Sequence, residues 1–462
     1  MGNRIVFFSI TALILFKIAA VYFTEFSLYG DEAQYLLWSK SLELGYFSKP
    51  PLLAWFLSGY IGVFGDSFIS LKAFPLVVYF FISFAVFRLC LLLSLSQSGS
   101  VFCGLSFLIM PAASLSSFLI STDLLLLLFW TMGMIVLLDT RNNNSILNFL
   151  LLGLFLGLAF LSKYAAVYFL LSLLLLIIMD NKTRGAFKNK PIGAVVFVIS
   201  FVLVLLPNIY WNLNNDWITL AHTSDNANLK NLNLNVFEPV KFLIAQILMV
   251  GPILFISFIF LIKHFVLDFE NKFLLIFSLP IIFIVLIESF LVRANANWAA
   301  PALISLFVLF FRLVNYYKSI FIKINFVVNY VVVVFLFGSI FVSSKNKAFD
   351  RVRGVGDFTE EISLMVGDKD LVVSDRIVFC NLSYEARNKS INLYMPYGGD
   401  GPITNHFQMS SPFNKNQKNS FFLIGELSDV SYLLKNFQGG LVREFVVPFS
   451  SNNLKLYEIN LK

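Results

Sequence analysis

Residues 192–210, IGAVVFVISFVLVLLPNIY, contain no charged side chain and form an almost unbroken apolar run. A helix needs roughly 20 mainly apolar residues to cross the hydrocarbon core of a bilayer, so this run predicts a membrane-spanning helix. Similar runs recur at residues 5–26, 72–94, 101–120, 124–139, 146–161, 164–179, 238–262, 273–292, 299–316 and 326–343. We therefore expect an α-helical polytopic membrane protein with about eleven transmembrane helices.

The composition supports the same fold class. Of the 462 residues, 58% are hydrophobic and only 13% are charged, which lies far from the usual composition of a soluble protein. The net charge is +7, and the basic residues lie between the apolar runs rather than in a stripe interleaved with aromatic residues, which argues against a nucleic-acid partner. The three cysteines do not suggest a disulfide framework. Membrane lipids are the expected surroundings.

The basic residues also predict an orientation. If the N-terminus is cytoplasmic, the cytoplasmic loops are those that hold Arg141, Lys182, Arg184, Lys188, Lys190, Lys263, Lys272, Lys318 and Lys323, as the positive-inside rule requires. The opposite face then receives the 27–71 loop, the turn at Asp123, Lys163, the 211–237 loop, the turn from Arg293 to Trp298, and the C-terminal tail.

The last part of the chain differs from the rest. From Ser344 onward, mixed charges, short β-branched runs at 371–373 and 421–424 and a turn signal at 398–401 replace the long apolar runs. We expect two domains: a transmembrane domain over 1–343, which includes the 27–71 loop with its interfacial helices, and a small extramembrane α/β domain over 344–462.

The first loop carries an acid pair. Residues 30–45, GDEAQYLLWSKSLELG, place Asp31 and Glu32 in the first turn of a helix that ends at a glycine. The Trp and Tyr residues of this helix favour a position along the membrane interface. The segment Ser48-Lys49-Pro50-Pro51 follows, and its prolines favour an extended Lys49. Capping of a solvated helix is the ordinary explanation of the acid pair.

Together, the acid pair, the interfacial helix and the Lys-Pro-Pro segment after a first span resemble the GT-C glycosyltransferases. The nearest groups are the protein O-mannosyltransferases and the bacterial aminoarabinose and galacturonic acid transferases of lipid A. Further blocks of this sequence are similar to those of the bacterial transferases and occur in the same order along the chain: 121–123, 157–164, 207–217, 297–301 and 350–354. One departure is Ser48, where relatives of the aminoarabinose branch carry an acid, so the role of that acid is not transferred.

The resemblance implies an enzyme of the bacterial inner membrane. It would move a sugar from a polyprenyl-phosphate donor to a lipid of the lipid A type, a glycan or a protein hydroxyl at the periplasmic face. Asp31 matches the catalytic acid, Glu32 would orient Asp31 or the sugar, and Asp123 is a candidate second acid. The candidates for the donor phosphate are Lys49, Lys163 and Arg293, and those for substrate binding are Trp211, Asn212, His222 and Trp298. His222 could bind a metal or the acceptor, but no acid–histidine spacing of a known site lies near it, so no cofactor is implied and a divalent metal stays an unsupported alternative.

Several of these residues have an alternative structural explanation. Asp123 could cap a helix, Lys163 and Arg293 could extend from helix ends toward the interface, and the tryptophans could be interfacial anchors. A transporter or flippase of a lipid-linked sugar would also carry charged residues within its helices. The sequence shows neither inverted repeats nor interrupted helices, and its large first loop and tail favour the enzyme.

Overall fold

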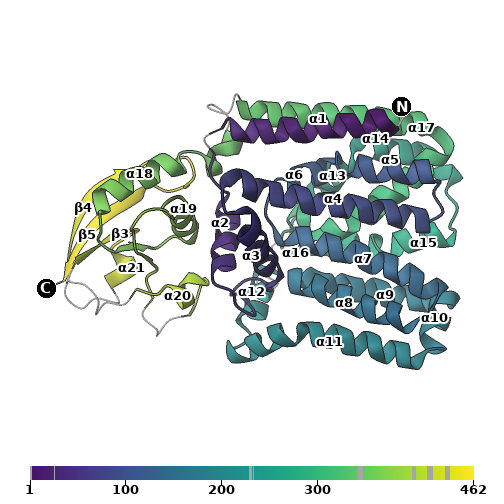
Figure 1. Ribbon diagram of the computed structural model, residues 1–462, viewed down its shortest axis with the longest axis horizontal. Helices are drawn as coiled ribbons and strands as arrows, with labels where there is room; N and C mark the ends of the chain where they lie inside the picture. Colours follow the sequence, from purple (N-terminus) through teal and green to yellow (C-terminus); the bar gives the residue numbers. More distant parts are fainter. Residues whose placement is uncertain are drawn as a thin grey trace. The chain divides into compact units, whose positions relative to one another are not determined.

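The structure is a computed structural model that describes residues 3–24, 26–227, 232, 234–341, 347–397, 402–413, 420–431 and 437–461 (Figure 1). The chain divides into two compact units. The helical unit comprises Met1–Ile18, Lys49–Leu53 and Leu71–Phe337, and the mixed unit comprises Ala19–Ser48, Ala54–Ser70 and Gly338–Lys462. The first loop therefore belongs largely with the C-terminal part of the chain rather than with the helices that flank it.

The helical unit contains most of the apolar runs. Its elements are α1 (Asn3–Tyr22), α4 (Phe68–Leu92), α5 (Gln97–Phe107), α6 (Pro111–Ser116), α7 (Thr122–Asn142), α8 (Ile146–Ser162), η1 (Tyr164–Ala166), α9 (Val167–Met179), α10 (Asn181–Lys188), α11 (Pro191–Asn214), α12 (Ile218–Ala227), α13 (Phe237–Val250), α14 (Pro252–Leu261), η2 (Ile262–His264), α15 (Phe269–Ile276), α16 (Leu279–Leu291), η3 (Ala296–Ala299) and α17 (Ala300–Gly338). The first residues of α4 and the last of α1 extend into the mixed unit.

Each apolar run coincides with helical structure, but the expected count of eleven spans is not confirmed. Among the described residues, six helices are long and apolar enough to cross a membrane, or eight if each sharply bent pair is one span. The run 238–262 forms α13 and α14, bent by 97° at Gly251, whose φ of +120° and following proline end the first helix. The runs 299–316 and 326–343 share α17, where the backbone leaves helical geometry at Lys318.

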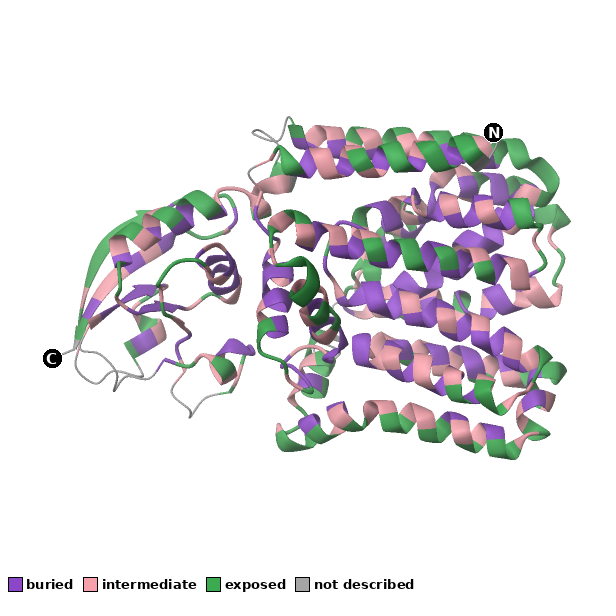
Figure 2. Cartoon of the chain, viewed as in Figure 1, coloured by how far each residue is buried: buried purple, intermediate pink, exposed green. Residues whose placement is uncertain are grey.

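The helices α7, α8 and α11 form a closely packed layer. Ideal Cβ atoms on Gly153 and Gly157 of α8 would lie 2.4 Å from the carbonyl oxygen of Phe197 and 2.7 Å from Cβ of Val204, both on α11. The two glycines are four residues apart, so they lie on one face and let the helix backbones approach. Figure 2 shows the contrast that results: α7 is largely buried, whereas α11 exposes apolar side chains, as a lipid-facing helix would.

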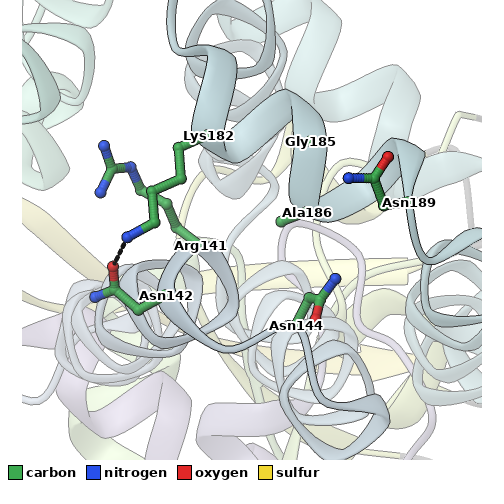
Figure 3. Close-up of a pocket in the computed structure, with 7 residues that line it drawn as sticks. All are labelled: Arg141, Asn142, Asn144, Lys182, Gly185, Ala186 and Asn189. Atoms are coloured by element: carbon green, nitrogen blue, oxygen red, sulfur yellow. Dashed lines mark hydrogen bonds between the residues drawn. The ribbon is translucent and has the colours of Figure 1, made fainter.

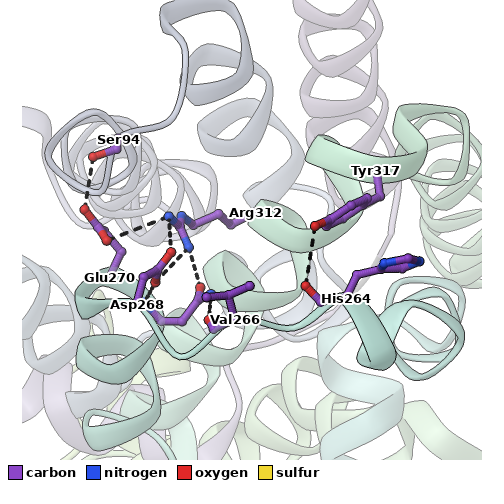
Figure 4. Close-up of polar contacts among 8 residues, drawn as sticks. Ser94, His264, Val266, Asp268, Glu270, Arg312 and Tyr317 are labelled. Carbon is purple, nitrogen blue, oxygen red and sulfur yellow. Dashed lines mark hydrogen bonds and ion pairs between the residues drawn. The ribbon is translucent and has the colours of Figure 1, made fainter.

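At one end of the helical unit, the side chain of Arg312 joins α17 to the segment that begins α15 (Figure 4). Its guanidinium donates to both carboxylate oxygens of Asp268 at 3.2 and 2.9 Å and to Oδ1 of Asn271 at 2.6 Å. Ser94, just after α4, donates to Glu270 at 3.1 Å. A bidentate Arg–carboxylate pair fixes direction as well as distance, so this segment is held firmly against α17.

The mixed unit contains a five-stranded sheet. Its elements are α2 (Gly30–Lys40), α3 (Leu52–Phe64), η5 (Lys347–Val352), α18 (Val355–Val366), β1 (Leu371–Val373), α19 (Arg376–Glu385), β2 (Leu393–Tyr394), α20 (Phe407–Ser410), β3 (Ser420–Ile424), α21 (Ser428–Ser431), β4 (Phe437–Phe445) and β5 (Leu454–Leu461).

The strand order is β2-β1-β3-β5-β4, with β1 parallel to β2 and β3 and the remaining pairs antiparallel. Val372 and Leu423 lie in register at the sheet centre and are fully buried. The small α/β region and its strands at 371–373 and 421–424 are therefore confirmed. The turn at 398–401 lies outside the described residues, as does the expected boundary at 343/344, so the domain limits stay a prediction.

Candidate active site

Glu32 has a capping role at the start of α2. Its Oε2 accepts the backbone N–H of Tyr29 at 3.0 Å, three residues earlier, which is the return contact of a capping box. The side chain is buried, with 1% of the residue exposed. Glu32 therefore stabilises the helix start that presents Asp31, and this ordinary explanation accounts for its position.

Asp31 is different, because its carboxylate extends toward another helix. Oδ1 lies 3.2 Å from Nη1 of Arg376, and the same Arg376 nitrogen donates to Oε1 of Gln34, one turn along α2. Arg376 is the first residue of α19, whose N-cap is Asp375. The Asp31 side chain keeps 43% of its surface exposed, so the carboxylate is oriented yet still accessible. Arg376 is not among the residues predicted for the site, because no sequence pattern connects it with Asp31.

Close packing explains why Arg376 reaches α2. A Cβ atom on Gly30 would lie 2.5 Å from Cγ2 of Ile377, so only glycine fits at this approach of α2 to α19. Ser27, just before α2, makes two further contacts: its side chain hydrogen-bonds to Glu385 at the end of α19, and its backbone N–H donates to the carbonyl of Val352 in η5 at 2.8 Å. The acid pair is thus part of an ordered surface of the mixed unit.

Trp38 of α2 packs inside the mixed unit. Its ring stacks on Tyr46 with centroids 4.4 Å apart, and the His406 ring meets both edge-on at 5.6 and 5.0 Å. Burial lowers the pKa of His406 to about 4, so the ring is neutral at pH 7. The 3.7 Å approach of its Nε2 to Glu43 is then a neutral contact rather than an ion pair. The cluster holds the C-terminal half of α2.

A second polar group lies in the helical unit and joins two of the sequence candidates. Nζ of Lys163, the C-cap of α8, lies 2.7 Å from Oδ1 of Asp123 in the first turn of α7. Nδ2 of Asn297 donates to the other Asp123 oxygen at 3.2 Å. The Lys163 and Asp123 side chains are only 16% and 12% exposed. Lys163 is therefore held by a carboxylate rather than extended toward the interface.

Asn212 takes part in a third cluster. Its Nδ2 donates to the Asn208 carbonyl at 2.9 Å and to the Tyr164 hydroxyl at 3.3 Å, while that hydroxyl donates to Oδ1 of Asn208 at 2.8 Å. The contacts join η1 to α11. Asn212 is 2% exposed, and no described residue donates to its Oδ1. That buried oxygen therefore lacks a hydrogen-bond donor among the described residues.

The other candidates are more scattered. Within the helical unit, Trp211 is buried, Lys49 and Trp298 are half-buried, and Arg293 is exposed. His222, on α12, has its Nε2 2.9 Å from Nδ2 of Asn226. Among the described residues, no three His, Cys, Asp or Glu side chains are arranged to hold a metal ion. The structure thus brings together Asp123 with Lys163 and Asp31 with Glu32, and it adds Arg376 to the second group.

Comparison with known proteins finds similarity to membrane glycosyltransferases. The family model for dolichyl-phosphate-mannose-protein mannosyltransferases matches residues 48–211, which include the Lys-Pro-Pro segment, Asp123 and Lys163. A curated relative, the lipid A galacturonosyltransferase RgtD of Rhizobium johnstonii, is 29% identical over 305 residues. That match covers 63% of this chain and 61% of RgtD. The chain is therefore similar to these glycosyltransferases over about a third of its length in the family model, and it spans about three fifths of the length of RgtD.

The GT-C fold extends over the whole chain. The crystal structure of ArnT from Cupriavidus metallidurans in the apo state matches with a TM-score of 0.66 and 12% identity, covering 98% of this chain and 97% of ArnT. The structure of ArnT bound to undecaprenyl phosphate matches with a TM-score of 0.68 and 13% identity, covering 99% and 98%. The family model and RgtD are both described as transferases, so the alternative of a transporter or flippase receives no support.

Proposed function

We propose that this GT-C protein is a membrane glycosyltransferase that moves a sugar from a polyprenyl-phosphate donor to a lipid acceptor. The observation that carries the proposal is the Asp31 carboxylate, accessible at the start of α2 and oriented by Arg376. Two comparisons support the substrates: RgtD is named a lipid A galacturonosyltransferase, and ArnT binds undecaprenyl phosphate. A lipid A acceptor and a galacturonic acid donor are therefore the first pair to test.

The reaction needs few catalytic groups. In such a donor the anomeric carbon is bonded to a phosphate, which is already a good leaving group, so no general acid is required. The acceptor hydroxyl must lose its proton as it attacks, and the phosphate gains negative charge as it leaves. A carboxylate for the proton and cations for the phosphate are sufficient.

Asp31 is the proposed base. An ionised carboxylate accepts hydrogen bonds only, so it can receive the acceptor hydroxyl proton at the oxygen that Arg376 leaves open. Arg376 would act as a positioning residue, because it contacts both Asp31 and Gln34 and so restricts the carboxylate to one direction. Glu32 would serve the same end by capping α2.

Lys163, Lys49 and Arg293 are the proposed cations for the donor phosphate. Lys163 is the best supported by geometry, since Asp123, itself held by Asn297, fixes the end of the Lys163 side chain in a poorly hydrated position. Charge interactions are stronger there than in water, where two unit charges 4 Å apart interact by only about 1 kcal/mol. Asp123 would then orient Lys163 rather than take part in proton transfer.

The residues proposed to bind the sugar and the acceptor are Trp211, Asn212, His222 and Trp298. The Oδ1 of Asn212 would accept from a sugar hydroxyl once neighbouring side chains move to expose it, and the indole rings are suited to the apolar face of a sugar. We also propose the orientation expected from the basic loops: a bacterial inner-membrane protein with a cytoplasmic N-terminus, a periplasmic first loop and a periplasmic C-terminal part.

The test is Asp31→Asn in membranes supplied with a polyprenyl-phosphate sugar. We expect transfer to lipid A, followed by mass spectrometry, to fall by at least about a hundredfold, because loss of a general base typically costs 10²–10⁴ in rate. Asp66→Asn is the matched control, since Asp66 is another acid of the first loop, paired with Lys40 at 2.7 Å, and we expect it to remain active. Full activity of Asp31→Asn would refute the assignment of the base.

A further inference from the structure

A cavity of about 310 Å³ opens where α7, α8 and α10 meet, far along the sequence from the acid pair (Figure 3). Its lining is polar and carries no acid: Arg141, Asn142, Asn144, Lys182, Gly185, Ala186 and Asn189. At about 30 Å³ per water molecule, this volume corresponds to about ten waters, which leaves ample room for a phosphate with a small alcohol attached. Figure 3 shows the two cations at one side and the amides of Asn144 and Asn189 at the other.

Arg141 is held so that part of its guanidinium remains available. Its Nε and Nη2 donate to the two oxygens of Asp180 at 2.8 and 3.2 Å, and its centre lies 3.3 Å from the Phe269 ring centroid. Phe269 follows Asp268, which Arg312 fixes in turn. In the described part of the chain, Nη1 of Arg141 makes no hydrogen bond. One face of a rigid guanidinium is thus left for a ligand.

Lys182 supplies the second charge and, unlike Arg141, has no acidic partner among the described residues. Its Nζ donates to Oδ1 of Asn142 at 2.7 Å, and no described carboxylate lies within ion-pair distance. Asp180, two residues before Lys182 in the chain, accepts instead from Arg141 and from the N–H and hydroxyl of Thr183 at 2.8 and 2.7 Å. The cavity therefore keeps an excess of positive charge.

The setting of α10 indicates what kind of anion reaches this cavity. The helix turns by 102° from the η1–α9 span, so it runs across the end of a membrane-spanning helix rather than along it. Its inner side is fastened by Phe187, whose ring packs edge-on against Phe149 and Phe197 at 5.1 and 6.3 Å. Such a helix lies at the level of lipid headgroups, on the side where basic residues collect.

We propose that this cavity binds the phosphate headgroup of an anionic membrane phospholipid, with Arg141 and Lys182 as the cations and the asparagine amides as hydrogen-bond donors. A lipid fits better than a free phosphate because α10 places the cavity beside the acyl chains that would anchor the headgroup. The site is separate from the proposed transfer chemistry. It would fix α10 against α7 and α8 at the membrane surface.

The test is native mass spectrometry of the full-length protein in detergent, titrated with phosphatidylglycerol. Lys182→Ala should lower the affinity about tenfold, the usual effect of losing one charge-assisted hydrogen bond. Lys188→Ala is the matched control: it removes the same charge from the same helix but does not line the cavity, and it should leave the affinity unchanged. Equal losses in the two variants would overturn the proposal.

Two further measurements identify the ligand and the place. Gly185→Leu should block binding by filling the cavity without changing charge, and it should fold, because the nearest atom to its Cβ is Asn189 Nδ2 at 3.8 Å. Unchanged binding in this variant would refute the cavity as the site. Phosphatidylethanolamine and inorganic phosphate should compete poorly. Displacement of phosphatidylglycerol by inorganic phosphate alone would overturn the assignment to a lipid.

Discussion

Oδ1 of Asp31 lies 3.2 Å from Nη1 of Arg376, although 345 positions separate the two residues in the chain. The contact joins the first turn of α2 to the first residue of α19. It gives the C-terminal part of the chain a direct role at the proposed base, rather than a role in substrate capture alone.

Arg376→Gln should lower kcat about tenfold and leave the KM for the donor nearly unchanged, because it frees the Asp31 carboxylate to take other directions without removing it. Arg376→Lys should restore part of the rate, since it retains the charge but not the planar fork. The control is Arg387→Gln, just after α19, where the guanidinium is 3.8 Å from Asp66. Equal effects of the two glutamine variants would contradict a specific positioning role.

Asp123 and Lys163 should be strongly coupled in stability. Lys163→Met leaves a poorly hydrated carboxylate without its cation, and Asp123→Leu leaves the cation without its carboxylate; either should cost about 3 kcal/mol. The double variant should be at least about 1 kcal/mol more stable than the sum of the two losses predicts. The measurement is a double-mutant cycle of unfolding in detergent, and simple additivity would show that the pair is not coupled.

His406 should make stability depend on pH. Its pKa falls from 6.5 to about 4 on burial, so the unfolded chain binds the proton more readily than the folded one. Above pH 6.5 the ring is neutral in both states and does not change the free energy of unfolding. As the pH falls from 6.5 to 4, the unfolded chain takes up the proton first, and the free energy of unfolding falls by up to about 3 kcal/mol. His406→Phe should reduce the fall in melting temperature over this range, whereas His264→Leu, which removes an exposed histidine, should not.

Gly153→Val should sharply lower the melting temperature and the yield of folded protein. The new Cβ would lie 2.0 Å from the Ser200 hydroxyl and 2.4 Å from a backbone carbonyl of α11, so the two helices must separate. Gly62→Val in α3 is the matched control, because it adds the same β-branched side chain to a helix where no atom lies within 4 Å. A similar loss in both variants would point to helix propensity rather than packing.

Local sequence patterns predicted much of the fold. The apolar runs located the helices, the change in composition after residue 343 indicated the α/β part, and the order of short motifs predicted the GT-C family. The number of spans could not be predicted from these patterns, because the bends at Gly251 and Lys318 depend on how neighbouring helices pack. The acid pair was visible as a helix start, and Glu32 turned out to have the capping contact that such a start predicts.

The sequence by itself determined which segments are apolar enough to be helices in a membrane, where acids cap a helix, and which residue types could handle a phosphate, since these depend on composition and on neighbours within a turn. Only the tertiary structure decided that Arg376 orients Asp31, that Asp123 holds Lys163, and that Arg141 and Lys182 share a cavity without an acid. Such pairings join residues far apart in the chain, and packing of whole helices brings them together.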